Sequence, residues 1–451
     1  MQLRVEPIDK IEGQVSVPGD KSISHRAVML GAIAEGTTKV HNFLTSEDCL
    51  HTVNVLQHLG VTIQNDGYTL SIEGKGLIGL EQSTQPLYFG NAGTGIRLMS
   101  GLLSGQVFNS TLYGDSHLNH RPMSRIISPL MKMGASIQGK LQGQELYPPL
   151  HIKGQPSLYG LQGIDYALPI ASAQIKSCLL LAGLYAKEQT VLSTNRITRD
   201  HTERLMQHMG VDLRCEKGQN KTGQNNSRVC LTPTKLYAKD ISVPNDISSA
   251  AFFMVGAAMS PGSHIILKNV GINSTRCGIL KILQRMGADI QLLNQSSGFE
   301  PTADIEVKGK TLVGITLPPE WVAEAIDEFP ILFIAACAAK GRSVFKGLAE
   351  LKVKESNRIS AMAKGLLKLG VKLELLEDGL IIEGIIDSGK PLSGGIVDSF
   401  CDHRIAMSFV VASLLANDPI EIKDSEYIST SFPNFRALAC DLGFKVFEEK
   451  S

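Results

Sequence analysis

Basic and small polar side chains gather at six places in the 451-residue chain, each at the start of an apolar stretch that we expect to form a buried helix. These places are residues 20–26, 90–97, 172–176, 245–249, 325–328 and 401–404. A helix N-terminus presents unpaired backbone N–H groups and a partial positive charge, and anions therefore bind there. The pattern predicts a binding site for anionic small molecules.

Helix capping by Ser, Asn and Asp explains part of this pattern. It does not explain four cations in these segments, which are Lys21, Arg26, Arg97 and Arg404. Because a cation in the first turn of a helix opposes the helix dipole, we interpret these four as ligands of a bound anion. Clusters at 119–122 and 352–358 carry similar residues, although an ordinary solvated helix face explains the second equally well.

Motifs for other kinds of chemistry are weak or missing. The sequence has no GxxxxGK[ST] loop and residues 90–95 are not a GxGxxG fingerprint, so neither ATP nor a dinucleotide is implied. His117 with His120, or His201 with His208, could be drawn as metal ligands, but there is no HExxH motif and no Cys/His set. A GxSxG elbow is also absent, which disfavours a serine hydrolase. We expect no metal and no cofactor.

The charges of the chain balance, with 44 Lys and Arg residues against 44 Asp and Glu. This balance argues against broad attraction to nucleic acid or to an anionic membrane, so any anion site must be local. The longest nearly apolar runs, 250–259 and 408–416, are about half of the roughly 20 residues that a membrane span needs. Residues 1–7 lack a leader-like pattern and the eight cysteines form no CxxC pair, so we expect a cytoplasmic protein, monomeric, with reduced and mostly buried thiols.

A hydrophobic-Gly-small-x-hydrophobic pattern recurs six times, at separations of 74, 76, 77, 83 and 73 residues. Its glycines are Gly60, Gly134, Gly210, Gly287, Gly370 and Gly443. Each glycine follows apolar residues at helical spacing and precedes alternating apolar residues, so we predict that it ends a helix at positive φ and that a strand follows. Six matches at near-constant spacing indicate an internal repeat.

A second helix in each repeat is rich in small and apolar residues. The six predicted ranges are 22–34, 93–103, 172–186, 247–258, 325–339 and 402–416. Helices that are apolar nearly all round are buried on most faces. Short β-rich stretches lie between the helices, so each repeat is a mixed strand and helix module of about 75 residues.

The chain is too long for one ordinary core, and six repeats suggest two domains of three. A polar, weakly patterned insertion at 216–228 precedes residues 241–246, which echo residues 15–20. We therefore place a domain boundary near residue 240.

Along essentially its whole length the chain resembles the 5-enolpyruvylshikimate-3-phosphate synthase family. The resemblance rests on motifs that follow one another in order: Pro18-Gly19-Asp20-Lys21-Ser22 with Arg26, Gly90-Asn91-Ala92-Gly93-Thr94 with Arg97, Arg121-Pro122-Met123, Ser172-Ala173-Gln174, Lys354-Glu355-Ser356-Asn357-Arg358 and Asp402-His403-Arg404. It implies an α/β (α+β) enolpyruvyl transferase fold with two domains, each of three βαβαββ repeats, that close over a central cleft. Residues 1–20 would join 241–451 in the C-terminal-type domain, and 21–240 would form the N-terminal-type domain.

The resemblance also implies the reaction, which is transfer of the enolpyruvyl group of phosphoenolpyruvate to the 5-hydroxyl of shikimate 3-phosphate with release of phosphate. This is a step of chorismate and aromatic amino acid biosynthesis. Both substrates carry a phosphate and a carboxylate, which accounts for a local gathering of cations and helix termini in a chain of zero net charge.

Site residues follow from the same motifs. Those implied to contact shikimate 3-phosphate are Lys21, Ser22, Arg26, Ser172, Ala173, Gln174, Asp327 and Lys354. Those implied to contact phosphoenolpyruvate are Lys21, Gly93, Arg121, Gln174, Arg358 and Arg404, with Asn91, Arg97 and Asp402 in support. The chemistry requires a base for the 5-hydroxyl proton and an acid for the enol carbon. We assign Asp327 as the base and Glu355 as the acid, with Lys21 as a third catalytic residue; either carboxylate could instead serve only in a salt bridge, and Asp327 also suits a helix cap.

The sequence departs from the family at two positions. Ala173 stands where some members have a second serine, and Thr430 where some have a lysine, which puts that lysine contact in doubt. Gly93 leaves room for the inhibitor glyphosate, whereas segments 198–203 and 326–330 look like those of glyphosate-tolerant members. We hypothesise sensitivity, with Gly93→Ala raising the inhibition constant.

Two alternative functions compete with this assignment. The sister enzyme that transfers enolpyruvyl to UDP-N-acetylglucosamine normally has a reactive cysteine before its Arg-Pro pair, and residues 114–122 contain none. A non-catalytic anion-binding homologue should have lost Asp327, Glu355 or Lys21, and all three are present.

Overall fold

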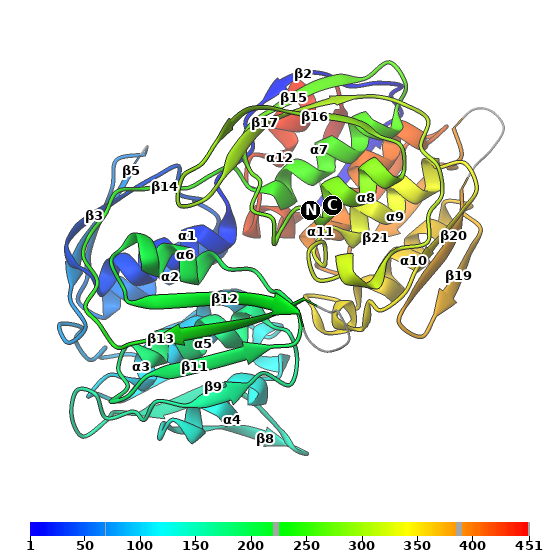
Figure 1. Ribbon diagram of the computed structural model, residues 1–451. Coiled ribbons are helices and arrows are strands. Elements are labelled where there is room, and N and C mark those ends of the chain that lie inside the picture. The colour runs from blue at the N-terminus through cyan, green and yellow to red at the C-terminus, as the bar shows by residue number, and fades with distance from the viewer. Residues whose placement is uncertain (68, 220–224, 385–389, 450–451) are drawn as a thin grey trace. The chain divides into compact units, whose positions relative to one another are not determined.

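The computed structural model describes residues 1–67, 69–219, 225–384 and 390–449 (Figure 1). Its contacts divide the chain into two units. We name Gly19–Val243 the N-unit, and Met1–Pro18 together with Pro244–Ser451 the C-unit. The chain therefore passes from one unit to the other after Pro18 and after Val243, where the sequence placed the divisions after residues 20 and 240.

The N-unit contains three repeats of strand, helix, strand, helix, strand and strand. Its helices are α1 (Lys21–Ala32), α2 (Glu47–His58), α3 (Gly93–Ser104), α4 (Ser124–Lys132), α5 (Ala173–Gly183) and α6 (His201–His208), with a short 3-10 helix at Leu118–His120. Its strands are β3 (Glu35–His41), β4 (Thr62–Asn65), β5 (Thr69–Lys75), β6 (Leu87–Tyr88), β7 (Ser110–Tyr113), β8 (Ser136–Gln142), β9 (Glu145–Lys153), β10 (Asp165–Ala167), β11 (Thr190–Thr194), β12 (Leu213–Gln219), β13 (Asn225–Leu231) and β14 (Ile241–Ser242).

The strands of the N-unit form four-stranded sheets of one common design. Their orders are β14-β3-β5-β4, β6-β7-β9-β8 and β10-β11-β13-β12. In each sheet the first two strands are parallel and the remaining pairs are antiparallel. A chain that joins two parallel strands needs a crossover such as a helix, whereas two antiparallel strands can be joined by a turn. The observed pairing therefore agrees with the βαβαββ order of elements.

The C-unit repeats the same plan. Its helices are α7 (Ile247–Met259), α8 (Gly278–Arg285), α9 (Phe329–Ala338), α10 (Arg358–Lys368), α11 (His403–Ala412) and α12 (Phe435–Asp441), with 3-10 helices at Pro319–Trp321, Ala349–Val353, Ser413–Leu415 and Ser425–Thr430. Its strands are β1 (Gln2–Glu6), β2 (Glu12–Val15), β15 (His264–Gly271), β16 (Asp289–Ser296), β17 (Thr302–Lys308), β18 (Arg342–Phe345), β19 (Leu373–Leu376), β20 (Gly379–Glu383), β21 (Gly395–Asp398), β22 (Ile420–Lys423) and β23 (Lys445–Glu449). The sheet orders are β16-β17-β15-β2, β18-β20-β19 and β21-β22-β1-β23. In the second sheet the place of the first strand is taken by two isolated parallel bridges, Val313 with Lys340 and Thr316 with Val344.

Strands β2 and β14 stand just before the two points where the chain passes from one unit to the other. Each pairs with a strand that is distant in the sequence. Strand β2 precedes α1 in the chain but pairs in parallel with β15 of the C-unit. Strand β14 precedes α7 but pairs in parallel with β3 of the N-unit. Strand β1 lies between β22 and β23 and so completes the last repeat of the C-unit.

The small-residue helices are the buried ones, as predicted. Every residue of α7 and of α11 is buried, and α9 is buried except at its last residue. These three helices contact one another, and α7 lies beneath β15 and β17 in Figure 1. In the N-unit, α3 contacts both α1 and α5. Burial of a helix on nearly every side follows from its lack of a polar face.

All six repeat glycines have positive φ, as predicted. The angles are 86° at Gly60, 93° at Gly134, 87° at Gly210, 91° at Gly287, 87° at Gly370 and 104° at Gly443. Each glycine directly follows the C-cap residue of α2, α4, α6, α8, α10 or α12. Glycine ends these helices because it adopts the left-handed conformation without a steric penalty.

Several local predictions were wrong. Helix α9 begins at Phe329 instead of 325, with Glu328 as its N-cap, because Pro330 fits the first turn and lacks the N–H that an interior position would need. Arg26 and Arg97 lie beyond the first turns of α1 and α3, so the dipole argument applies only to Lys21 and Arg404.

Two further expectations also need correction. The insertion at 216–228 is mostly the antiparallel pair β12 and β13, apart from residues 220–224, which lie outside the described residues. Of the eight cysteines, all free, three are buried, whereas most were expected to be.

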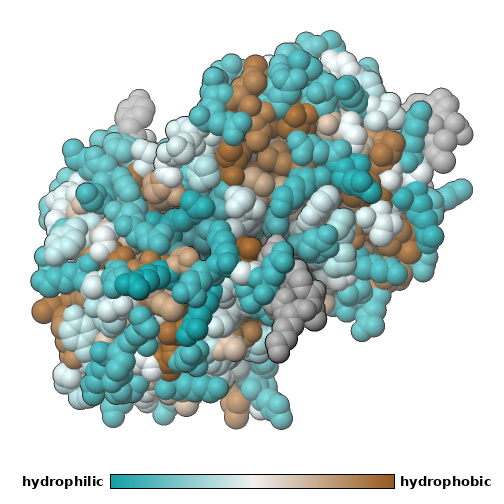
Figure 2. All heavy atoms as spheres, in the orientation of Figure 1, coloured by the Kyte–Doolittle hydropathy of each residue, from teal (hydrophilic) through white to brown (hydrophobic). Residues whose placement is uncertain are grey.

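The surface is mixed in polarity. Hydrophilic residues cover much of the face in Figure 2, and hydrophobic residues form separate patches on it. Such exposed apolar groups are normal for a folded protein. None of the helices in the described part of the chain has the length and apolar character of a membrane span.

Candidate active site

The first predicted site residues of the N-unit lie at the start of α1. Asp20 caps this helix, its side chain accepting from the N–H of Ile23 at 2.8 Å. Lys21 follows at the first helical position, and its Nζ lies 3.1 Å from Oδ2 of Asp48 on α2. The pair is partly exposed, so the ammonium is held in place yet still borders solvent.

Arg26 is held by hydroxyl and carbonyl oxygens from two other helices and its own. Its Nε donates to Thr202 Oγ1 of α6 at 2.6 Å, one terminal nitrogen to Ser177 Oγ of α5 at 2.8 Å, and the other to the carbonyl of Ser22 at 2.8 Å. Thr202 also donates to Ser177 at 2.7 Å. All three side chains are buried, so the guanidinium has a defined orientation.

The second and third repeats are linked through Gln174. Its side-chain oxygen accepts from Arg97 at 2.8 Å, and its nitrogen donates to Thr94 Oγ1 at 3.2 Å. Ser172 caps α5 by accepting from the N–H of Ile175 at 3.4 Å, and Ala173 is the first helical residue. The structure thus brings the Ser172-Ala173-Gln174 motif to the start of α3.

Arg121 lies against the glycine-rich start of α3. One of its terminal nitrogens donates to Asn91 Oδ1 at 2.5 Å. A Cβ placed on Gly93 would lie 2.8 Å from the other terminal nitrogen of Arg121 and 3.5 Å from Arg97. Because 2.8 Å is closer than such atoms approach, only glycine fits here while Arg121 keeps this position.

In the C-unit, Arg358 joins three carboxylates. It is 1% exposed and begins α10, and its Nε donates to Asp402 Oδ2 at 2.8 Å. Its terminal nitrogens lie 2.6 Å from Glu355 Oε2 and 3.4 Å from Asp327 Oδ1. Burial lowers the pKa of the Arg358 guanidinium, but the charges of Asp402 and Glu355 outweigh burial and raise this pKa above its ordinary value.

The predicted base is surrounded by cations. Oδ1 of Asp327 lies 3.3 Å from Nζ of Lys354 in addition to its contact with Arg358. The backbone carbonyl of Asp327 accepts from Arg404 at 3.2 Å. Both carboxylates assigned to catalysis therefore contact the same guanidinium, although their residues are 28 positions apart in the sequence.

Arg404 is placed by the start of α11. Asp402 is the N-cap of this helix, and its Oδ1 accepts from the backbone N–H of Arg404 at 3.0 Å while its side chain also holds Arg358. Arg404 lies 3.9 Å from the buried carboxylate of Glu328, which in turn accepts from Ser248. Asp402 thus holds the side chain of Arg358 and the backbone of Arg404, and both arginines are predicted to contact phosphoenolpyruvate.

Thr430 has a local partner. Its hydroxyl donates to the carbonyl of Tyr427 at 2.7 Å, at the end of the 3-10 helix Ser425–Thr430. It therefore supplies no long cation of the kind that a lysine would bring to this position.

A buried histidine lies next to the predicted cations. His25 is 1% exposed, and its Nδ1 pairs with Thr52 Oγ1 at 2.8 Å. Burial first, and then the charges of Lys21 and Arg26, lower its pKa from 6.5 to about 3. The imidazole is therefore neutral near pH 7 and adds no charge to the site.

Several contributing residues were missed by sequence reasoning. They are Asp48, Ser177, Thr202, Ser248 and Glu328. Asp48 resembles any acidic residue in a first helical turn, and Ser177 and Thr202 resemble ordinary polar residues of a helix. Ser248 and Glu328 lie in the helix-start segments 245–249 and 325–328, but neither was assigned a role. The partners of these side chains are 27 to 176 positions away, so no local pattern would have identified their contacts.

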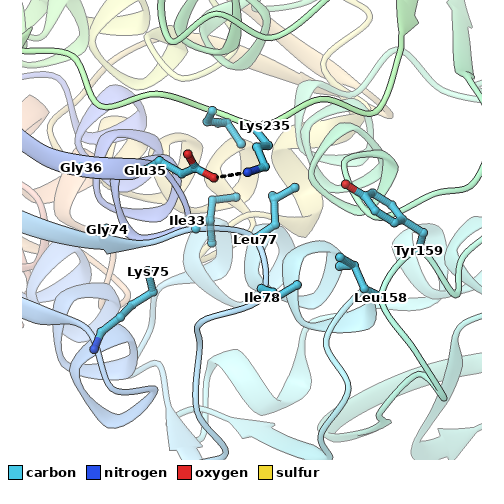
Figure 3. A pocket seen from close by; sticks show the side chains of 12 residues that line it. Ile33, Glu35, Gly36, Gly74, Lys75, Leu77, Ile78, Leu158, Tyr159 and Lys235 are labelled. Carbon is cyan, nitrogen blue, oxygen red and sulfur yellow. Dashed lines mark ion pairs between the residues drawn. The ribbon is translucent and has the colours of Figure 1, made fainter.

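A cavity of about 360 Å³ lies elsewhere in the N-unit (Figure 3). It is lined by the end of α1, the start of β3, the end of β5 and two later segments at 158–159 and 235–236. None of its lining residues is a predicted site residue, and Glu35 and Lys235 form an ion pair across it at 2.6 Å. The cavity is therefore separate from the predicted substrate contacts. Within the described ranges, no group of three or more His, Cys, Asp or Glu side chains is arranged to hold a metal ion.

Comparisons with known proteins agree with the motifs. The family model described as EPSP synthase (3-phosphoshikimate 1-carboxyvinyltransferase) matches residues 5–438. Proteins named 3-phosphoshikimate 1-carboxyvinyltransferase from Coxiella burnetii (strain CbuK_Q154) and Methylococcus capsulatus are each 50% identical over 444 residues, which is 98% of this chain and 97% of theirs.

Solved structures give the same result. The structure of EPSP synthase from Acinetobacter baumannii is similar with a TM-score of 0.85 at 46% identity, covering 99% of this chain and 100% of that one. A second structure of EPSP synthase from Acinetobacter baumannii has the same TM-score at 45% identity and covers both chains completely. The chain therefore belongs to the EPSP synthase (3-phosphoshikimate 1-carboxyvinyltransferase) family.

Proposed function

We propose that this chain transfers the enolpyruvyl group of phosphoenolpyruvate to the 5-hydroxyl of shikimate 3-phosphate and releases inorganic phosphate. The observation that carries the proposal is the C-unit cluster, in which Asp327 and Glu355 contact the guanidinium of Arg358. It combines two carboxylates for proton transfer with cations for anionic substrates. The family membership supplies the identity of those substrates.

Shikimate 3-phosphate is assigned ligands in both units. The proposed contacts are Lys21, Ser22, Arg26, Ser172, Ala173 and Gln174 of the N-unit, and Asp327 and Lys354 of the C-unit. The buried hydrogen bonds of Arg26 support its part, because they set the direction of its guanidinium before substrate arrives. At Ala173 only the backbone N–H can contribute, at the first position of α5.

Phosphoenolpyruvate is assigned to a second set. It consists of Lys21, Gly93, Arg121 and Gln174 of the N-unit and Arg358 and Arg404 of the C-unit, with Asn91, Arg97 and Asp402 as supports. Guanidinium groups suit this ligand because their paired N–H donors match the oxygens of phosphate and carboxylate. Asn91 holds Arg121, and Asp402 holds the side chain of Arg358 and the backbone N–H of Arg404, which agrees with supporting roles.

The reaction consists of an addition and an elimination. In the addition, the 5-hydroxyl oxygen bonds to C2 of phosphoenolpyruvate, Asp327 takes the hydroxyl proton and Glu355 gives a proton to C3. In the elimination, the carboxylate of Glu355 takes a proton from C3, the C2–C3 double bond reforms, and the C2–O bond to phosphate breaks. Lys21 would stabilise the anionic groups during both steps.

The ion pair between Glu355 and Arg358 bears on the acid role. At 2.6 Å the guanidinium favours an ionised carboxylate, whereas a general acid must carry a proton. Arg358 is also a proposed ligand of phosphoenolpyruvate. An anionic substrate that draws the guanidinium away from Glu355 would make protonation of Glu355 easier, so substrate binding itself would prepare the acid.

Phosphate release tests the proposal. Purified protein is incubated with phosphoenolpyruvate, with and without shikimate 3-phosphate, in buffer that contains a metal chelator. Release that requires both substrates is expected, and kcat should fall by about 100-fold or more in Asp327→Ala and in Glu355→Gln, as is typical for loss of a general acid or base. Release only with UDP-N-acetylglucosamine would refute the choice of acceptor, and no release with either would refute enolpyruvyl transfer.

Three more properties belong to the proposal. The N-unit and C-unit would act as the two domains of the enzyme, the protein would be a monomer, and its location would be cytoplasmic. Sedimentation velocity checks the second property, and fractionation of the source cells checks the third.

A further inference from the structure

The N-unit contains an ion pair that the proposed mechanism does not use. Nζ of Lys176 on α5 lies 2.5 Å from Oε1 of Glu203 on α6, and each side chain is 2% exposed. The second oxygen, Oε2 of Glu203, is buried without a hydrogen-bond partner among the residues that the structure describes.

Stability alone does not explain such a buried ion pair. Removing two charges from water carries a large desolvation cost, and attraction offsets this cost only when the remaining polar atoms are also satisfied. Here one carboxylate oxygen is not satisfied. Apolar side chains of similar size are often as stabilising in this situation or more so. A charged pair does differ from apolar contact in one respect, since it fixes a single relative position of the two helices.

The neighbours of the pair show what that position serves. Ser177 follows Lys176 on α5, and Thr202 precedes Glu203 on α6. These two hydroxyls hold the guanidinium of Arg26 and hydrogen-bond to each other, so Arg26, Ser177 and Thr202 form a closed triangle. A slip of α6 along α5 by a fraction of an ångström would disturb both bonds of Thr202, the one from Arg26 and the one to Ser177.

We propose that Lys176 and Glu203 are positioning residues for shikimate 3-phosphate binding: their ion pair fixes α5 against α6 so that Ser177 and Thr202 aim the Arg26 guanidinium. This inference rests on the proposed function, in which Arg26 is a ligand of that substrate. The effect is selective, because the arginines assigned to phosphoenolpyruvate have other partners: Asn91 holds Arg121, Asp402 holds Arg358, and the backbone carbonyl of Asp327 holds Arg404.

The first test uses Glu203→Gln, which keeps the shape of the side chain and removes its charge. We expect the KM for shikimate 3-phosphate to rise about tenfold, a typical loss for a displaced binding group, while the KM for phosphoenolpyruvate changes less than about twofold. Because this variant leaves Lys176 buried without its carboxylate, its melting temperature should fall as well.

The deciding variant is Lys176→Met with Glu203→Leu, which replaces the pair by apolar side chains. It should recover most of the melting temperature but keep the raised KM for shikimate 3-phosphate, because apolar contact does not define the helix position as sharply. The control is Ile152→Ala, a cavity in β9 away from the triangle, which should lower the melting temperature and leave both KM values unchanged. A wild-type KM for shikimate 3-phosphate in the double variant would overturn the inference.

A measurement without substrate separates this inference from the proposed function. The side-chain Nε–H signal of Arg26, assigned in a ¹⁵N NMR spectrum by its loss in Arg26→Lys, should move in the double variant because its bond to Thr202 changes. An unmoved signal would also overturn the inference. A moved signal together with an unaltered KM for shikimate 3-phosphate in Arg26→Lys would instead mean that the positioning is real and the assignment of Arg26 as a ligand is wrong.

Discussion

At the scale of single residues, Gly93 combines a steric requirement for glycine with a proposed substrate contact. An added Cβ would lie 2.8 Å from Arg121, a residue that is 8% exposed and whose guanidinium is held by Asn91. We predict that Gly93→Ala moves this guanidinium and raises the KM for phosphoenolpyruvate about tenfold, with a smaller effect on the KM for shikimate 3-phosphate. Steady-state kinetics with each substrate varied in turn measures the effect.

The same variant tests the inhibitor hypothesis, since Gly93→Ala should also raise the inhibition constant for glyphosate. Gly298→Ala is a suitable control, because the nearest atom to its Cβ would be 3.4 Å away, an ordinary contact. An unchanged KM for phosphoenolpyruvate in Gly93→Ala would mean that Arg121 has room to move at no cost. An unchanged inhibition constant would remove the steric argument for the inhibitor.

His25 gives a prediction about pH. Its pKa is lowered to about 3 in the folded protein, mainly by burial, and is near 6.5 in an unfolded chain. Between these values the unfolded state binds a proton that the folded state does not, so stability falls as pH falls. From pH 6.5 to pH 5 this residue alone should remove about 1.5 kcal/mol from the free energy of unfolding.

His25→Asn checks this, because asparagine can still pair with Thr52 but does not titrate. Urea denaturation of both proteins at pH 6.5 and pH 5 gives the difference between their losses. We expect the wild type to lose more by about 1.5 kcal/mol. Equal losses would show that His25 becomes protonated in the folded protein over this range.

At the scale of elements, the helix-ending glycines set where the outer helices stop. Gly287 follows α8 with φ of 91°, and an added Cβ would meet no atom within 4 Å. A substitution at Gly287 therefore tests backbone strain alone, because it adds no steric clash. We predict that Gly287→Ala lowers the free energy of unfolding by about 1–2 kcal/mol, and that Gly287→Asn costs less because asparagine tolerates this conformation.

Chemical denaturation measures both variants, and neither should alter kcat, since Gly287 is not a proposed site residue. Gly298→Ala again serves as the control, because Gly298 does not have positive φ. If alanine and asparagine were equally tolerated at Gly287, the conformation of this glycine would not be what ends α8.

At the scale of the whole molecule, the two units differ in how the chain builds them. The N-unit is one continuous stretch, Gly19–Val243, whereas the C-unit needs residues 1–18. Strand β1 lies between β22 and β23, so its removal would break the sheet in the middle. We predict that a fragment of residues 19–243 folds with a cooperative thermal transition by circular dichroism, and that a fragment of residues 244–451 does not.

A permuted fragment makes this prediction sharper. Gln2 pairs with Glu449 in the antiparallel register of β1 and β23, so a short linker can join the two strands as a hairpin. Residues 244–451 followed by a Gly/Ser linker and residues 1–18 should therefore fold. Cooperative folding of residues 244–451 without β1 and β2 would contradict the role given to these strands.

The sequence by itself determined the features that depend on neighbours in the chain. Repeat spacing located six helix ends, and small apolar residues identified the buried helices, because helix capping and amphipathicity depend on residues within a turn or two. The motifs around Lys21, Gly93, Lys354 and Asp402 were also sufficient to identify the family. The start of α9 at Phe329 was the local feature most clearly misplaced: the prediction began this helix at 325, whereas Pro330 belongs in the first turn of a helix.

Only the tertiary structure decided which distant groups meet. The family resemblance placed residues 1–20, which contain β2, with the C-terminal-type domain. That β14 joins β3 could not be read from its segment, because β2 and β14 have nearly the same sequence pattern and strand pairing depends on a partner far along the chain. The same holds for the Lys176–Glu203 pair and for the triangle that aims Arg26. Side-chain hydrogen bonds extend over only about 3 Å, so the packing of whole helices decides which of them form.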